Sequence, residues 1–107
     1  MSNRNRDAGN AWERECINRM KDLGYDAVSS RQESRAADAS GIDIISESFP
    51  LKPQCKKQKN QPNIHTLLTE TEAEVIFYQK VEKRGKRFYS VGEYVMLSMD
   101  DFFKLIK

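Results

Sequence analysis

The chain of 107 residues is predicted to fold as a single α/β domain, an α+β arrangement in which helices flank a mixed sheet. Two patterns support this prediction. Apolar residues recur at helical spacing near the N-terminus, whereas later segments are rich in the β-branched and aromatic residues that favour strands. The expected order of elements is α-β-β-β-α-β-β-α. A hydrophobic content of 38% supports one modest core in a chain of this length.

The N-terminal half is expected to contain one helix and two short strands. Residues 1–8 are polar and are expected to be flexible. A helix is predicted over residues 9–23, because Trp12, Cys16 and Met20 recur at helical spacing and Gly24 is a suitable stop. The segments that follow are a strand over 27–30, a loop over 31–40, a strand over 42–46 and a turn over 46–50.

The second half is expected to complete the sheet. Residues 51–57 are predicted to be the antiparallel partner of the strand over 42–46. Proline cannot donate a ladder hydrogen bond, so Pro53 is expected either at a bulge or facing away from a neighbouring strand. Ser98 begins a capping-box pattern, Ser98-Met-Asp-Asp101, that opens a C-terminal helix. Between these segments we expect a loop over 58–63, a helix over 65–73, a strand over 75–81, a turn around Gly85 and a strand over 88–97.

The positive charge of the chain is clustered, although the net charge is only +2. Residues 48–69 contain no Asp or Glu and include four lysines, a distribution that suits phosphate contacts. A second cluster comprises Lys80, Lys83, Arg84, Lys86 and Arg87. This second cluster has two readings, a phosphate-binding surface or a charged turn that needs no ligand.

Other sequence features argue against a disulfide-rich, zinc-binding, membrane-spanning or secreted protein. Cys16 and Cys55 are too few for a disulfide framework, and with the lone His65 they do not match a zinc pattern. No run of residues is long and apolar enough for a transmembrane helix, and the N-terminus lacks the apolar stretch of a signal peptide. A cytoplasmic location without membrane association is therefore expected.

A carboxylate lies within an apolar strand pattern, where aspartate is unusual. Asp43 is flanked by isoleucines, and Gln54 and Lys56 follow two residues apart, so that they project from one face of a strand. If the two segments pair, the three side chains converge. A carboxylate, an amide oxygen and a lysine are suited to bind Mg²⁺ and to polarise a phosphodiester.

Glu13 is the expected fourth member of this site. It lies on the apolar face of the predicted helix, where a buried carboxylate requires a partner such as a metal ion. Glu15 lies on the other side, four residues before Arg19, as in a surface ion pair. Asp38 is a rival to Asp43, because it precedes the same strand within an Ala/Ser segment.

The ordered residues resemble the PD-(D/E)xK nuclease superfamily. The segment Gly9-Asn-Ala-Trp-Glu13-Arg-Glu-Cys-Ile, with Leu23-Gly-Tyr, is similar to the opening helix of its Holliday-junction resolvase branch, of the phage and archaeal type. The Arg- and Ser-rich segment from Ser30 to Asp43 is similar to the approach to the metal-binding aspartate there. Gln54 departs from the glutamate that is more common in the family, which leaves the number of bound metal ions open.

The resemblance implies a restriction-endonuclease-like core and a Mg²⁺-dependent DNA endonuclease, with Mn²⁺ as a substitute ion. It implies catalytic roles for Glu13, Asp43, Gln54 and Lys56, with the first three as metal ligands. The implied substrate is a four-way junction or other branched DNA, cut by a homodimer. DNA contacts are expected from Arg31, Ser34, Arg35, Lys52, Lys57 and Lys59. The alternatives are a restriction- or repair-type nuclease of the same fold, or a catalytically inactive DNA-binding or assembly module.

Overall fold

A three-stranded mixed sheet is the framework of the fold in this computed structural model, which describes residues 4–33 and 35–107, with only the backbone for residues 4–8. Its strands are β3 (Pro53–Gln58), β4 (Val75–Arg84) and β5 (Arg87–Leu97). Strand β3 runs parallel to β4, and β4 runs antiparallel to β5. The described residues form an α+β fold with five helices, of which α1 (Arg4–Asp22) is the longest.

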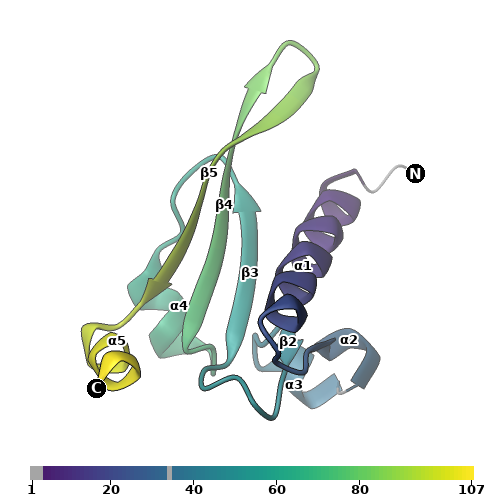
Figure 1. Cartoon of the computed structure of the whole chain (residues 1–107). Helices are drawn as coiled ribbons and strands as arrows, with labels where there is room; N and C mark the ends of the chain where they lie inside the picture. Colours follow the sequence, from purple (N-terminus) through teal and green to yellow (C-terminus); the bar gives the residue numbers. More distant parts are fainter. Residues whose placement is uncertain (1–3, 34) are drawn as a thin grey trace.

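The two faces of the sheet are covered by different helices. Cys55 and Phe77 pack against the buried residues of α1, and the indole Nε1 of Trp12 donates a hydrogen bond to the carbonyl oxygen of Phe77 at 3.0 Å. Alternate residues of β4, Ile76 and Tyr78, pack instead near α4 (Ile64–Glu70), which connects β3 to β4. Because side chains alternate along a strand, α1 and α4 cover opposite faces (Figure 1).

A small second sheet lies beside the first. Strands β1 (Val28–Ser29) and β2 (Ile44–Ile45) pair antiparallel, and two short helices connect them, α2 (Ser30–Glu33) and α3 (Arg35–Ala39). The predicted loop over 31–40 is therefore wrong for most of its length. The alanines of α3 are strong helix formers, and Gly41, at a φ of 89°, turns the chain out of α3 into β2.

The predicted antiparallel pairing of residues 42–46 with 51–57 is also wrong in its extent. Strand β2 pairs with β1, and β3 pairs with β4. One backbone hydrogen bond joins the two segments, from the N–H of Asp43 to the carbonyl oxygen of Pro53 at 2.9 Å. Pro53 is the first residue of β3 rather than a bulge, and this position requires no N–H.

Most other predicted elements are present with shifted ends. Helix α1 begins at Arg4 instead of residue 9, and Gly24, at a φ of 97°, follows its end as expected. Residues 1–3, part of the segment expected to be flexible, lie outside the described residues. The hydroxyl of Ser98 accepts a hydrogen bond from the N–H of Asp101 at 3.1 Å, which confirms the predicted cap of α5 (Met99–Ile106). No helix in the described part of the chain has the length and apolar character needed to cross a membrane.

Candidate functional site

Asp43 is anchored to the open edge of β3 by its backbone and by its side chain. Its Oδ2 atom accepts a hydrogen bond from the N–H of Cys55 at 2.8 Å. Its backbone N–H donates to Pro53, two residues earlier in the same strand. The carboxylate therefore occupies a position where a hairpin partner would supply a carbonyl oxygen, and its place relative to β3 is well defined.

The environment of Asp43 disfavours its charge. Burial raises the pKa of the Asp43 carboxyl, and the carboxylates of Glu13 and Asp38 act in the same direction. The N–H of Cys55 and the ammonium of Lys56 oppose this shift but do not cancel it. Three of the charged groups selected from the sequence, together with the rival Asp38, thus interact electrostatically at one place.

Gln54 lies between the two residues that hold Asp43, and its carbonyl group is unsatisfied. The side chain is buried, and its Oε1 atom has no hydrogen-bond partner. A buried acceptor without a partner costs about 1–3 kcal/mol, so a native structure needs a reason to keep one. A hard cation that binds oxygen ligands would satisfy this atom.

Gly41 creates the space that Gln54 occupies. A Cβ atom at position 41 would lie 3.2 Å from Nε2 of Gln54 and 2.7 Å from Cβ of Thr71. The φ of 89° also favours glycine there. The glycine before Ile42 was visible in the sequence, but its contact with Gln54 was not predicted.

Lys56 follows Gln54 on the same face of β3 and is partly buried. Cys55 lies on the opposite face, against the α1 core. A side-chain hydrogen bond with Cys16, together with burial, raises the pKa of the Cys55 thiol. The thiol therefore stays neutral at physiological pH, which makes it a poor nucleophile.

Glu13 approaches this site from α1 and is already paired. It is buried, and its Oε1 atom accepts a hydrogen bond from the hydroxyl of Ser29 at 2.7 Å. Its Oε2 atom forms an ion pair with Nη2 of Arg31 at 3.2 Å. Gln54 lies on the face of β3 away from α1, whereas Glu13 comes from α1. Asp43, at the edge of β3, is therefore the residue that links Gln54 and Glu13.

The two acidic residues considered as alternatives to Glu13 and Asp43 are both exposed. Glu15 is exposed and pairs with Arg19 at 3.3 Å, which confirms the predicted i,i+4 surface pair. Asp38 is exposed and accepts a hydrogen bond from the hydroxyl of Ser30 at 3.5 Å. Among the described residues, no group of three or more His, Cys, Asp or Glu side chains is placed to hold a metal ion.

A Mg²⁺ site here would therefore depend on two carboxylates and one amide. All of these donors are oxygen atoms, which fits the preference of Mg²⁺, and the unpartnered Oε1 of Gln54 fits the same role. The low ligand charge favours weak binding. The pairing of Glu13 with Arg31 means that this carboxylate joins the set only if it shares or releases its partner.

The expected DNA contacts are spread over several elements. Arg31 binds Glu13 and also donates to Oδ1 of Asn10 at 2.7 Å, so it supports the site in addition to being partly exposed. The Arg31–Glu13 pair was not predicted, because the two residues are 18 positions apart and share no periodic pattern. Among the other residues expected to contact DNA, Arg35, Lys52 and Lys59 are exposed, and Lys57 is partly buried.

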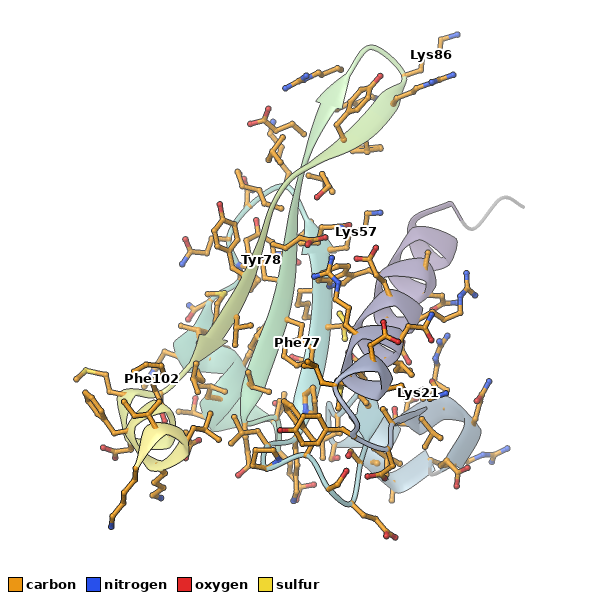
Figure 2. All side chains as sticks on the ribbon, in the orientation of Figure 1. Lys21, Lys57, Phe77, Tyr78, Lys86 and Phe102 are labelled. Atoms are coloured by element: carbon orange, nitrogen blue, oxygen red, sulfur yellow. The ribbon has the colours of Figure 1, made fainter. Side chains whose placement is uncertain are left out.

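Two of these positions need separate mention. Ser34 lies outside the described residues. Lys57 lies near the C-terminal end of β3 on the side of α1, as Figure 2 shows.

Comparisons of the chain with protein-family models, with curated proteins and with solved structures found no match.

Proposed function

We propose that this protein is a Mg²⁺-dependent DNA endonuclease with a restriction-endonuclease-like core, acting on four-way junctions or related branched DNA. The observation that carries the proposal is the buried, unpartnered Oε1 of Gln54, which lies in the chain between the two residues that hydrogen-bond Asp43. Lys56 follows on the same strand face, and Glu13 interacts with Asp43 from α1. Carboxylates, an amide oxygen and a lysine at one strand edge are the groups that metal-assisted phosphodiester hydrolysis requires.

Each residue has a defined role in this proposal. Asp43 and Gln54 would hold the ion, which would supply a Lewis acid for the phosphate and would lower the pKa of a bound water. The N–H of Cys55 orients the carboxylate of Asp43. The ammonium of Lys56 stabilises negative charge that develops on the phosphate. Arg31 and Ser29 hold the Glu13 carboxylate in a fixed orientation.

The junction substrate and the homodimer rest on the sequence resemblance and on one surface property. Cutting a four-way junction requires two paired incisions, which a two-fold dimer supplies. Helix α5 leaves large apolar side chains exposed, as does the adjoining part of β5, and such a surface is suited to association with a second copy. The residues concerned are Tyr94, Val95, Met99, Phe102, Phe103, Leu105 and Ile106.

Cleavage assays with matched DNA forms test the proposal. Linear duplex, nicked duplex and four-way junction are incubated with Mg²⁺, with Mn²⁺ or with a chelator. The proposal requires metal-dependent incision that is lost in Asp43→Asn and kept in Glu15→Gln, whose side chain is exposed and pairs with Arg19. Incision of linear duplex at the same rate as junction would favour the restriction- or repair-type alternative.

A catalytically inactive DNA-binding module is the second candidate. The pairing of Glu13 with Arg31 and the absence of a three-residue acidic or histidine group among the described residues favour it. Binding of junction DNA without incision in either Mg²⁺ or Mn²⁺ would support this function and reject the endonuclease.

A further inference from the structure

The β4–β5 hairpin extends well beyond the rest of the sheet. Strand β3 ends where Gln58 pairs with Lys80, so the part of β4 that follows pairs with β5 alone. A register shift between Lys80 and Val81 marks the start of this two-stranded ribbon. Figure 1 shows the ribbon projecting past the ends of β3 and α1. Every residue from 82 to 91 is exposed, and we call this segment the arm.

The arm carries mostly positive charge. Its cations are Lys83, Arg84, Lys86 and Arg87, and its one carboxylate is Glu82. Glu82 lies 3.9 Å from Arg84, and both side chains are largely exposed, so this pair neutralises little of the field. Among the described side chains, Lys83, Lys86 and Arg87 have no carboxylate partner. Such an excess of charge at the tip of a projecting ribbon attracts a polyanion.

Aromatic rings accompany the cations on both faces of the arm. The Nζ atom of Lys83 lies 5.9 Å from the ring centre of Phe88, and Cζ of Arg84 lies 5.5 Å from that of Tyr89. Phe88 is 58% exposed and Tyr89 is 42% exposed. A charged turn that served only solubility would not need two exposed rings beside its cations. Rings next to cations are suited to a partner that offers both phosphates and flat or apolar groups.

We infer that the arm is a DNA-binding ribbon that enters the major groove of one double-stranded segment of the substrate. The inference rests on the proposed function for the identity of the polyanion. A two-stranded ribbon has the dimensions that the major groove of B-form DNA admits. Lys83, Lys86 and Arg87 contact phosphates on the groove walls, and Phe88 contacts base edges or thymine methyl groups. Lys57, near the C-terminal end of β3, and the arm then bind the same DNA.

A matched pair of double variants tests the arm. Lys83→Ala with Lys86→Ala removes two charges from the arm. Lys21→Ala with Lys104→Ala removes two exposed lysines. Lys21 lies at the end of α1 away from the arm (Figure 2), and Lys104 is in α5, which also lies away from the arm (Figure 1). Fluorescence anisotropy with duplex and junction DNA is measured over a salt series in chelator, so that no cleavage occurs. Because all four side chains are exposed, thermal unfolding of both variants should match that of the wild type.

The arm variant is expected to lose about tenfold in affinity for both DNA forms and to show a salt slope smaller by roughly one to two. The control pair should stay within about twofold of the wild type, since surface charges far from the contact are screened. Phe88→Ala should weaken binding with an unchanged salt slope, because it removes no charge. Equal losses in the two double variants would overturn the inference, since net charge would then explain the binding.

Different results would reject the nuclease activity and the DNA-binding role of the arm. Weakened binding in the arm variant, in a protein that cuts no DNA, would keep the arm and reject the enzyme. Wild-type DNA affinity in the arm variant, in a protein that cuts DNA with Mg²⁺, would reject the arm and keep the enzyme. The latter result would assign the basic ribbon to another acidic partner, such as RNA or a protein.

Discussion

The Oδ2 atom of Asp43 accepts a hydrogen bond from the backbone N–H of Cys55 at 2.8 Å. This contact places the carboxylate on the strand edge next to Gln54, whose Oε1 atom is buried without a partner. A side chain thus performs the role of a backbone acceptor in a sheet, and the pairing of the two segments stops there. The consequences of this arrangement for activity, pH dependence and metal binding can be measured.

Asp43→Asn should reduce cleavage by at least about 100-fold, because it removes the charged metal ligand, and each factor of ten corresponds to about 1.4 kcal/mol. Binding of DNA in chelator should change little, since phosphate contacts come from Lys and Arg side chains. Single-turnover cleavage and anisotropy measure the two effects. A variant that cuts at the wild-type rate would remove Asp43 from the metal site.

The same substitution should raise the stability of the metal-free protein at neutral pH. Burial, with help from Glu13 and Asp38, raises the pKa of the Asp43 carboxyl in the folded state above its ordinary value of 3.8. The folded protein therefore holds this proton to higher pH than the unfolded chain, and the charged form costs stability once the pH exceeds the folded pKa. Asparagine avoids this cost.

Thermal unfolding of wild type and Asp43→Asn in chelator, over a pH series, measures this effect. The advantage of the variant should be largest near neutral pH and should disappear as the pH falls below 3.8. A variant that is less stable than the wild type at neutral pH would mean that the hydrogen bond from Cys55 and the charge of Lys56 outweigh burial.

Gln54→Glu should tighten Mg²⁺ binding by roughly tenfold, because an added carboxylate raises the ligand charge. Without metal, the variant should be less stable than the wild type at neutral pH, since a second carboxylate would be buried at this strand edge together with that of Asp43. Mg²⁺ titrations followed by thermal unfolding and by cleavage give both quantities. An unchanged Mg²⁺ dependence would indicate that Gln54 does not bind the ion.

Arg31→Ala should expose the conflict between ion pairing and metal binding at Glu13. The Glu13 side chain is 8% exposed, whereas that of Arg31 is 37% exposed, so loss of the arginine leaves a buried carboxylate with only Ser29. We expect a loss of about 1–3 kcal/mol in the metal-free protein. Mg²⁺ should restore more stability to this variant than to the wild type, since Glu13 is then free to bind it.

Arg35→Ala is the matched control for this substitution, because Arg35 is exposed and forms no ion pair among the described residues. It should leave stability and the Mg²⁺ response unchanged. An equal Mg²⁺ response in Arg31→Ala and in the wild type would separate Glu13 from the metal site.

Phe103→Asp should weaken self-association if α5 and β5 form the proposed dimer surface. Phe103 is 53% exposed, so a charge at this position adds little strain within one chain but would be buried in the dimer. Light scattering after size-exclusion chromatography measures the mass over a concentration series. Lys104→Glu, which changes an exposed charge on the same helix, serves as a control. A wild-type protein that is monomeric at all concentrations would reject the homodimer.

The secondary-structure predictions were correct where they depended on residues close together in the sequence. The strand around Val75–Val81 follows from consecutive β-branched and aromatic residues, and the cap at Ser98 follows from a four-residue motif. The prediction of a loop over 31–40 was wrong because it gave more weight to the Arg- and Ser-rich composition of this segment than to the helix propensity of the alanines in α3. Strands β4 and β5 reach closer to the turn than predicted, because the two strands extend one another by pairing in the arm.

The partner of β3 could not be predicted in the same way. Sequence proximity favoured a hairpin with the strand before it, whereas β3 pairs parallel with β4 across the connecting helix α4. That choice depends on burying Ile76 and Tyr78 beneath α4, a gain that arises only when distant segments pack together.

For the candidate site, the sequence alone determined which side chains share a face. Alternation along β3 groups Gln54 with Lys56 and separates both from Cys55, and the helical period turns Glu13 inward and Glu15 outward. These relations follow from backbone geometry, which is the same wherever an element lies.

The tertiary structure alone decided what those side chains contact. It paired Glu13 with Arg31, held Asp43 on the N–H of Cys55, and fitted the Gln54 amide against Gly41. It also placed the basic turn at the tip of a two-stranded ribbon that extends beyond β3 (Figure 1). Each of these contacts joins residues from different elements, or depends on where a neighbouring strand ends, so each depends on how whole elements pack rather than on local pattern.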